Sequence, residues 1–351
     1  MADERERLQR AGEILLKKQQ ERLAKGEAAP EQPSLLDALL PAVWKPEQIK
    51  PAAKSAIRIP AGPVMTDAVL IRPEDILYVH SIFLQCFMPV RHNAKNAQRW
   101  ETGNRDAKLL IKAGELINPN DPGKFRQCLV PAGPKARIVT AYIHDYAFRH
   151  KTPEIDLGES MREFMAQAGI PIGGKNGKEL QREMENVAAA DIYFGWWNPG
   201  VSAGQRKAPV SEEFSFWIDK DPRQATLWQP KMLLSKKYFD AILEGQHLAP
   251  IYWPALKALQ HSARAMDIFT FLSYRLWTIP LNRPLPLKID ILHGMFGRDI
   301  KQRKHFWPRF LRALEDAARH YPNARYQVMN DCVMFWHSPP IIPHKKSVQI
   351  T

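Results

Sequence analysis

The sequence has few cysteines and lacks any long apolar run. Its 351 residues include only three cysteines, which lie far apart and form no Cys-x-x-Cys pair: Cys86, Cys128 and Cys332. That pattern argues against a disulfide framework and a thiolate zinc site, and it suits a reducing compartment. The most apolar stretch, residues 265–277, is interrupted by Asp267 and Arg275, and it is shorter than the roughly 18 residues of a membrane span. Residues 1–7 lack the apolar core of a secretory signal. We therefore expect a cytoplasmic protein without a membrane segment.

Acidic residues are too few to balance the basic ones. The chain has 50 Lys and Arg against 37 Asp and Glu, a net charge of +13. The excess is uneven, because residues 246–351 carry 15 basic and 6 acidic residues, a net charge of +9. A basic region on an otherwise nearly neutral chain is typical of a protein that binds a polyanion, most simply nucleic acid. A surface charged only for solubility is the alternative.

The composition divides the chain into four parts. Residues 1–63 combine a highly charged helical stretch with a proline-rich linker, which predicts a flexible N-terminal arm. Residues 64–245 and 246–340 have globular patterns, and residues 341–351 form a short tail. The beginning of the first globular part is an N-terminal extension without recognisable chemistry, although residues 76–88 place apolar side chains at helical spacing.

Two successive units repeat one order of predicted elements: helix, strand, helix, turn, helix and hairpin. In the first unit we expect helices at 135–150, 161–168 and 178–189, with strands at 154–157, 192–197 and 214–218. In the second unit we expect helices at 262–277, 290–296 and 301–320, with strands at 286–289, 326–329 and 332–336. Ser160 and Glu163 form a capping box, Ser262 is placed as an N-cap, and Gly297 ends a helix. We therefore predict an α+β fold with two tandem winged helix-turn-helix domains, of which the second is the main DNA-binding domain.

The last long helix of the second unit carries the strongest local signal. Seven side chains at or near its beginning are candidate DNA contacts: Arg298, Lys301, Arg303, Lys304, His305, Arg309 and Arg312. No acidic residue interrupts the stretch 301–312, and the apolar positions 306, 310, 314 and 317 fall on one side of a helix of about 100° per residue. Such a helix is typical of DNA recognition in the major groove, where Arg bonds to guanine and Lys neutralises phosphate. A basic face exposed only to solvent is the alternative.

The corresponding helix of the first unit gives a weaker signal. Its candidate DNA contacts are Lys175, Asn176, Lys178 and Arg182, diluted by three glutamates. These residues could contact phosphates, or the domain could serve mainly as a protein interface. Arg206 and Lys207 lie in a loop where the wing of a winged helix would reach the DNA backbone or minor groove. A surface loop without contacts is the alternative for that pair.

No constellation of catalytic residues emerges, so we expect no enzyme, no cofactor and no metal site. The segment 169–176 resembles a phosphate-binding loop, but Asn176 stands where Ser or Thr must hold Mg²⁺, and a predicted helix precedes it in place of a strand. The sequence also lacks the His-hydrophobic-His metal pair of nicking initiators. Tryptophans could stack on bases in a single-strand binder. Most of them occupy apolar-periodic positions that favour core packing: Trp196, Trp197, Trp217, Trp228, Trp277, Trp307 and Trp336.

Several segments resemble one known family. Residues 129–137 and 151–165 are similar to the plasmid-encoded RepA family of theta-type plasmid replication initiators, and the likeness continues in order between residues 75 and 340. The resemblance implies a bacterial initiator that binds directly repeated origin sequences (iterons) in double-stranded DNA. It also implies that the protein opens the origin, recruits the host initiator and helicase, and represses its own promoter as a homodimer.

The predicted linker contains one further resemblance. Gln32, Ser34, Leu35 and Leu36 are similar to the short peptide by which replication proteins dock on the bacterial sliding clamp, although Pro33 stands where Leu is usual. A linker patch without a partner is the alternative.

The observations together predict a plasmid replication initiator of the bacterial cytoplasm, associated with the nucleoid and plasmid. A winged-helix transcriptional repressor without a replication role shares every fold feature and is the competing hypothesis.

Overall fold

The computed structural model describes residues 71–95, 97–104, 107–118, 121–198, 202–215, 231–243 and 248–342. The predicted N-terminal arm, with its clamp-like peptide, lies outside the described residues, as do residues 343–351 of the predicted tail. All described residues belong to one compact body, residues 49–351.

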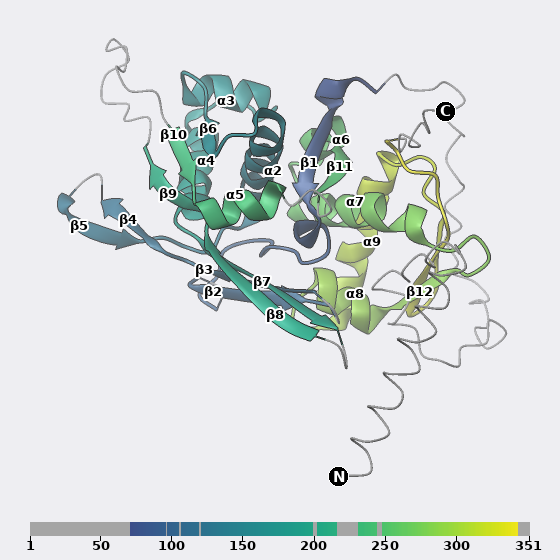
Figure 1. Ribbon diagram of the computed structural model, residues 1–351. Coiled ribbons are helices and arrows are strands. Elements are labelled where there is room, and N and C mark those ends of the chain that lie inside the picture. Colours follow the sequence, from purple (N-terminus) through teal and green to yellow (C-terminus); the bar gives the residue numbers. More distant parts are fainter. Residues whose placement is uncertain are drawn as a thin grey trace, which may run out of the picture. The chain divides into compact units, whose positions relative to one another are not determined.

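The described part of the chain has a mixed α/β fold, in agreement with the predicted α+β class (Figure 1). Its helices are α2 (Gly133–His150), α3 (Met161–Gln167), α4 (Gly174–Ala188), α5 (Lys236–Leu243), α6 (Trp253–Ala258), α7 (Ala263–Arg275), α8 (Ile289–Phe296) and α9 (Arg303–Arg319). The 3-10 turns are η3 (Pro73–Asp75), η4 (Ser81–Leu84) and η5 (Leu276–Thr278). The first strands are β1 (Ile76–His80), β2 (Arg99–Gly103), β3 (Ala107–Lys112), β4 (Glu115–Asn118), β5 (Asp121–Gln127), β6 (Glu154–Asp156) and β7 (Asp191–Asn198). The remaining strands are β8 (Ser202–Pro209), β9 (Ser211–Phe214), β10 (Lys231–Leu234), β11 (Leu248–Tyr252), β12 (Leu285–Lys288), β13 (Tyr326–Val328) and β14 (Cys332–Phe335).

The second unit follows the predicted order element by element. Helix α7 is followed by strand β12, helices α8 and α9, and the hairpin β13–β14. The three strands form one antiparallel sheet in the order β12-β14-β13. Ser262 caps α7 by accepting a hydrogen bond from the Ala265 N–H at 3.2 Å, and α8 ends at Gly297. Local signals are sufficient here because caps and turns bound these elements.

The first unit has the same order but contains an insertion. Helix α2, strand β6, and helices α3 and α4 follow one another as predicted, and Ser160 caps α3. The hairpin that completes the unit is β9–β10, in a sheet of order β6-β10-β9 that matches the order in the second unit. The prediction that strands at 192–197 and 214–218 form one hairpin is therefore wrong. The first of them, β7, pairs with β8 over its whole length, although the Ser, Gly and Pro of β8 are residues typical of a loop.

The helical spacing at residues 76–88 also predicts the wrong structure. These residues form strand β1 and the turn η4, and β1 pairs antiparallel with β11 at the beginning of the second predicted globular part. The Nδ1 atom of His80 accepts a hydrogen bond from the Ile82 N–H at 3.2 Å where the strand ends and the turn begins. Pairing with a distant strand overrides local spacing, because strand stability depends on the neighbours that the fold supplies.

Strands β2, β3, β7 and β8 form a four-stranded antiparallel sheet. The inner face of this sheet carries the buried side chains of Leu109, Ile111, Ile192, Phe194 and Ala208. The Phe194 ring packs against His80 of β1, at 5.2 Å between ring centroids, and against Tyr238 of α5, at 6.2 Å. The predicted N-terminal extension therefore supplies half of a sheet whose other half is the insertion in the first unit.

Arg137 of α2 and Asp267 of α7 form a buried ion pair between the two units. The Nε and Nη2 atoms of Arg137 donate to the two carboxylate oxygens of Asp267 at 2.6 and 2.7 Å. The same guanidinium donates to the carbonyls of Met88 at 2.7 Å, Gly133 at 2.8 Å and Pro89 at 3.2 Å. Burial raises the pKa of Asp267, and the charge of Arg137 opposes that rise. Both side chains are only 8% exposed, so each buried charge is compensated by the other, and the ion pair joins the two helices.

Candidate nucleic-acid interface

Helix α9 separates apolar and basic side chains onto opposite sides, as predicted. Phe306, Phe310, Leu314 and Ala317 are buried, and the Phe310 ring packs on Phe296 of α8 at 5.7 Å between centroids. The helix begins at Arg303, two residues after the predicted start. The buried row fixes the orientation of the helix, so the residues of the other side project into solvent.

Five of the seven side chains predicted here have no protein partner in the described structure. Within the described residues, no hydrogen bond or ion pair engages the exposed side chains of Lys301, Lys304, His305, Arg309 and Arg312. We call these five residues the α9 basic cluster. A phosphate or base edge could bind them without first breaking a contact within the protein, which favours a role in ligand binding over a role in stability.

The other two predicted side chains have protein partners. Arg303 forms an ion pair with Asp290 of α8, and both side chains are exposed. Arg298 donates from Nε to the Gly294 carbonyl and from Nη1 to the Glu101 carbonyl of β2, each at 2.8 Å. Arg298 therefore attaches the turn between α8 and α9 to the edge strand of the four-stranded sheet.

Helix α4 presents a second, smaller set of cations. Lys175, Lys178 and Arg182 are exposed and lie at i, i+3 and i+7, on one side of the helix. Arg182 lies 3.5 Å from Glu183. The predicted contact Asn176 is engaged within the protein instead, because its amide donates to the Pro171 carbonyl at 2.8 Å and accepts from Lys135 at 3.2 Å. The three cations, without the asparagine, remain the candidates on this helix.

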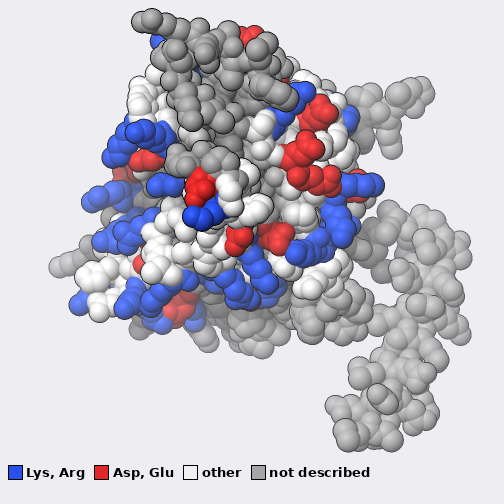
Figure 2. All heavy atoms as spheres, turned by 90° about the vertical axis from the view of Figure 1, so that its left-hand side faces the viewer, with Lys and Arg blue, Asp and Glu red and all other residues white. Residues whose placement is uncertain are grey.

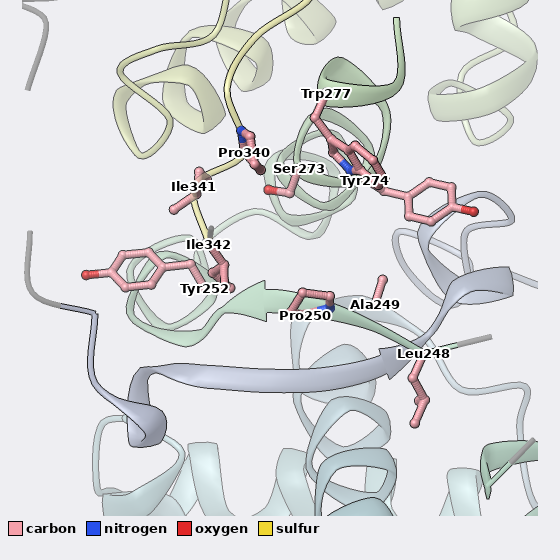
Figure 3. A pocket seen from close by; sticks show the side chains of 10 residues that line it. All are labelled: Leu248, Ala249, Pro250, Tyr252, Ser273, Tyr274, Trp277, Pro340, Ile341 and Ile342. Atoms are coloured by element: carbon pink, nitrogen blue, oxygen red, sulfur yellow. The ribbon is translucent and has the colours of Figure 1, made fainter. Parts of the chain in front are cut away.

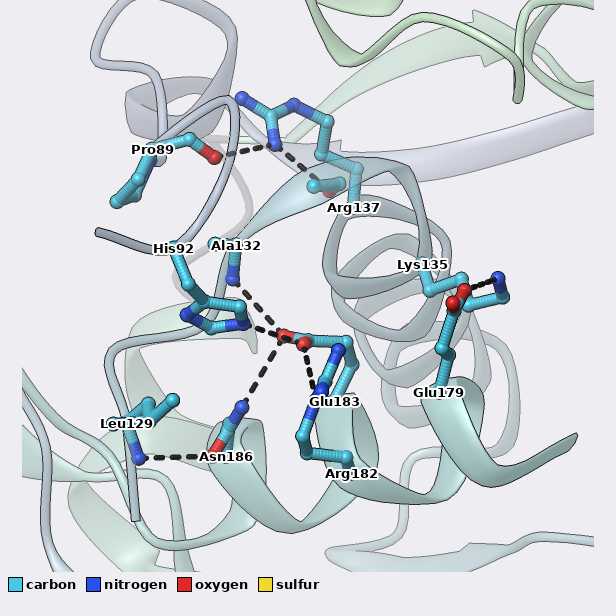
Figure 4. A network of polar contacts seen from close by, with 11 residues as sticks. Pro89, His92, Leu129, Ala132, Lys135, Arg137, Glu179, Arg182, Glu183 and Asn186 are labelled. Atoms are coloured by element: carbon cyan, nitrogen blue, oxygen red, sulfur yellow. Dashed lines mark hydrogen bonds and ion pairs between the residues drawn. The ribbon is translucent and has the colours of Figure 1, made fainter. Parts of the chain in front are cut away.

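Each of the three glutamates of α4 also has a partner outside this helix, and Figure 4 shows the partners of Glu179 and Glu183. Glu183 is 3% exposed and accepts hydrogen bonds from the Ala132 N–H at 3.0 Å and from Asn186 at 3.4 Å, while its Oε1 lies 2.7 Å from His92 Nε2. Glu179 pairs with Lys135 at 2.6 Å, and that ammonium lowers the pKa of the Glu179 carboxyl. Glu185 pairs with Arg126 of β5.

Glu183 is the site residue that sequence reasoning missed. Its carboxylate attaches α4 to the segments that contain His92 and Ala132, and so it fixes the helix that presents the cations (Figure 4). A signal was available, because Glu183 lies within the helical sector of the buried Leu180 and Met184. A carboxylate in an apolar sector indicates a buried polar network.

Arg206 and Lys207 lie in strand β8, so their predicted placement in a wing loop is wrong. Arg206 is half-buried and stands opposite Phe194 on the inner-face register of the sheet. Lys207 is exposed on the other face and pairs with Asp191 at 2.9 Å, which raises the pKa of the Lys207 ammonium. The two neighbouring cations therefore face opposite sides of one sheet.

The tryptophans do not fill the core as predicted. No tryptophan with a described side chain is fully buried, and Trp196 and Trp277 are 49% and 37% exposed. Trp307 is half-buried and stacks on Phe310 at an interplanar angle of 14°. Large indole rings commonly remain part-exposed at the edge of a core, which explains why apolar periodicity alone is misleading here. Trp217 and Trp228, and the side chain of Trp197, lie outside the described residues.

A pocket of about 240 Å³ lies between β11, the end of α7 and the segment 340–342 (Figure 3). Its lining is mainly apolar or aromatic, and it includes Ser273, whose buried hydroxyl has no hydrogen-bond partner in the described structure. No carboxylate, imidazole or thiol lines this pocket.

Metal-ligand clusters and membrane-spanning helices are both absent from the described residues. No group of three His, Cys, Asp or Glu side chains in this part of the chain is placed to hold a metal ion. None of its helices is both long enough and apolar enough to cross a bilayer.

The surface charge is unevenly spread. Figure 2 shows the face of the molecule on which β4, β5, β9 and β10 lie at the left of Figure 1. Lys and Arg side chains spread over much of the lower half of this face, with Asp and Glu among them, and acidic side chains gather towards the upper right. The excess of basic residues in the sequence therefore appears as basic areas of the surface.

Comparisons with known proteins give one family and a set of distant structures. Residues 130–285 match the family described as "Plasmid encoded RepA protein". The crystal structure of RctB domains 2-3 is 10% identical, with a TM-score of 0.45 over 73% of this chain and 95% of that chain. A selenomethionine derivative of RctB domains 2 and 3 is 9% identical, with a TM-score of 0.46 over 74% of this chain and 98% of that chain. No curated protein matches the sequence.

The family match begins just before α2 and ends at the beginning of β12. It covers the first unit and continues through α7 of the second, and it confirms the resemblance on which the sequence analysis rests. Residues 130–285 are similar to the family of plasmid encoded RepA proteins, and this similarity indicates a plasmid replication initiator protein.

Proposed function

We propose that this protein is a plasmid replication initiator that binds directly repeated origin DNA (iterons) through α9. The observation that carries the proposal is the α9 basic cluster, whose five side chains are exposed and have no partner in the described structure. They project from the helix whose opposite side is locked into the core by Phe306 and Phe310. A rigidly held helix with solvated cations is the form of a DNA-recognition helix.

A winged helix-turn-helix in each unit is the fold that best supports this role. The order α7-β12-α8-α9-β13-β14, with a sheet of order β12-β14-β13, supports it for the second unit. The matching sheet order β6-β10-β9 supports it for the first unit. In this arrangement α9 enters the major groove with its exposed side towards the base edges.

The residues of the α9 basic cluster then divide by chemistry. Arg309 and Arg312 each present a planar guanidinium that can bond bidentately to guanine, so we assign sequence preference to them. Lys301 and Lys304 are point charges near the beginning of the helix, and we assign them to phosphates. Arg298 and Arg303, already paired within the protein, position the α8–α9 turn.

The first unit adds contacts to the DNA backbone in this proposal. Lys175, Lys178 and Arg182 form the smaller cation row on α4, and fewer exposed cations predict a smaller share of the affinity. The same unit supplies much of any homodimer interface. Deformation of the DNA costs a few kcal/mol that the combined contacts offset, so the protein acts by binding energy without covalent catalysis.

The remaining steps of the proposal are supported by the family resemblance. They are the opening of the origin, the recruitment of the host initiator and helicase, and repression of the protein's own promoter, which would set plasmid copy number. The clamp-like peptide adds docking on the sliding clamp. We place these events in the bacterial cytoplasm, at the nucleoid and the plasmid.

A winged-helix transcriptional repressor is the second candidate, because the basic helix α9 suits an operator as well as an iteron. Direct repeats beside the gene favour the initiator, and a single inverted repeat favours the repressor.

The test is an anisotropy titration of the full chain with DNA that flanks its own gene, against a scrambled duplex, at several salt concentrations. We expect a preference of about 10³-fold or more, with affinity that falls steeply as salt rises. Weak binding that ignores sequence would overturn the proposal. Replication of an origin-less plasmid that carries the gene and its flanking DNA then separates the initiator from the repressor.

A further inference from the structure

The outer face of the four-stranded sheet is exposed to solvent. The side chains on this face alternate with the buried ones along each strand, as the pleat requires. Lys108 and Lys112 of β3 and Lys207 of β8 are exposed, and Tyr193 of β7 is half-buried between these strands. Helix α5 packs on the other side of the sheet (Figure 1). On that side the Phe194 ring stacks on Tyr238. The outer face is thus a surface that the core of the protein does not use.

The outer face combines an aromatic ring with an excess of cations. Its register places Tyr193 between Leu110 and Lys207, with Lys112 one row away. The ammonium groups of Lys112 and Lys207 lie over the Tyr193 ring at 5.2 and 5.7 Å from its centroid. Four cations lie on this face against two carboxylates: Arg99, Lys108, Lys112 and Lys207 against Glu101 and Asp191.

The row next to Tyr193 carries small residues. Lys108 stands there between Gly103 of β2 and Gly195 of β7, and Gln205 of β8 lies at the other end of the row. A Cβ atom at Gly195 would lie 3.1 Å from the Lys108 Cβ, which shows that the Lys108 stem passes close to the strand. The two glycines therefore make room for the Lys108 stem on the outer face.

We propose that the outer face of this sheet binds single-stranded DNA, with Tyr193 stacking on a base and Lys108 and Lys112 contacting phosphates. An unpaired base presents a flat face to an aromatic ring, and lysines on both sides of that ring can follow a flexible backbone. Stacking on the ring needs an unpaired base, because a duplex buries the faces of its bases between their neighbours, so the ring favours a single strand over a duplex.

The position of this face relative to α9 gives the proposal a place in the function. Arg298, at the turn before α9, is hydrogen-bonded to the Glu101 carbonyl of β2, so the turn adjoins the edge of the sheet. A duplex on α9 and a single strand on the sheet would therefore be held by neighbouring parts of one body. The joint binding of a duplex and a single strand rests on the proposed function of α9, whereas the binding of a single strand by the sheet does not.

The test is an anisotropy titration of the full chain with labelled oligo(dT) of about 16 nucleotides, a length within the range bound by single-strand binding folds. Tyr193→Ala should weaken binding of oligo(dT) at least fivefold, roughly the loss of one stacked base. Tyr193→Phe, which keeps the ring, should stay within about twofold of the unaltered protein. Lys108→Ala removes an exposed cation without a described partner, and it should also weaken binding. Lys237→Ala removes an equally exposed cation from α5, on the other side of the sheet, and should leave binding unchanged.

The outcomes separate this proposal from that for α9. We expect Tyr193→Ala to retain binding of the flanking duplex, and Arg309→Ala to lose duplex preference while retaining oligo(dT). The proposal is overturned if the unaltered protein fails to bind oligo(dT) where it binds duplex, or if Lys108→Ala and Lys237→Ala behave alike. Equal loss of duplex and oligo(dT) binding in Tyr193→Ala, or tighter binding of oligo(U) than of oligo(dT), also overturns it.

Discussion

Removal of the Asp267 carboxylate should destabilise the protein more than any change on its surface. The carboxylate is held by two hydrogen bonds of 2.6 and 2.7 Å from Arg137, and both side chains are 8% exposed. In Asp267→Ala the guanidinium loses its counter-charge but keeps the carbonyls of Met88, Pro89 and Gly133. Breaking a buried pair by removing one partner costs about 3–5 kcal/mol, because the remaining charge is uncompensated.

The assay is urea and thermal unfolding of the full chain, followed by circular dichroism. For a body of this size the loss corresponds to a fall in Tm of roughly 6–20 °C. Asp267→Asn keeps one oxygen acceptor for Arg137, so it should lose less than Asp267→Ala. Glu315→Ala is the matched control, because Glu315 forms an exposed pair with Arg319 on α9, and exposed pairs contribute about 1 kcal/mol or less. Equal stability of Asp267→Ala and Glu315→Ala would refute the reasoning that the buried pair joins the two units.

Three further predictions concern other parts of the described structure. Burial, and to a lesser extent the charge of His80, holds the pKa of the fully buried His144 well below 6.5. The free energy of unfolding should therefore decrease as the pH falls below 6.5, by at most about 1.4 kcal/mol per pH unit. Urea unfolding at several pH values should show that His144→Gln flattens this dependence, and an unchanged slope would contradict the assignment. Glu183→Ala should cost about 3 kcal/mol and speed amide exchange in α4, whereas equal exchange in Glu183→Ala and Glu179→Ala would argue against its anchoring role. Lys304→Ala should reduce the slope of log affinity against log salt by about 0.9 at unchanged sequence preference, and a changed preference would place Lys304 on a base.

The second unit was predictable because its signals are local. Ser262 caps α7, Gly297 ends α8, and the apolar row of α9 lies at helical spacing, so each element could be placed from a few neighbouring residues. The exposed side of α9 followed from the same periodicity. The partners of Arg298 and Arg303 did not follow from it, because one lies on a distant strand and the other on the preceding helix.

The four-stranded sheet was not predictable, because its pairings are long-range. Strands β2 and β3 meet β7 and β8 across the whole of the intervening α2, α3 and α4. Strand β8 also contains residues that are typical of loops. Strand β1 has apolar residues at helical spacing, but it forms a strand because it pairs with β11. Strand propensity depends on such partners more than helix propensity does, so the strand pairing of the first unit and its extension could not be predicted from the sequence.

In the proposed function, unpaired cations on α9 read the DNA sequence. The most direct test compares Arg309→Ala with Arg319→Ala, two substitutions that remove the same group from one helix. Arg309 has no partner in the described structure, whereas Arg319 in the last turn pairs with Glu315 and Asp316. In competition anisotropy between the flanking DNA and a scrambled duplex, we expect Arg309→Ala to lose about 5- to 150-fold of its preference, which corresponds to one bidentate base contact. Arg319→Ala should keep the preference of the unaltered protein. Equal preference in the two variants would contradict the assignment of α9 as the recognition helix.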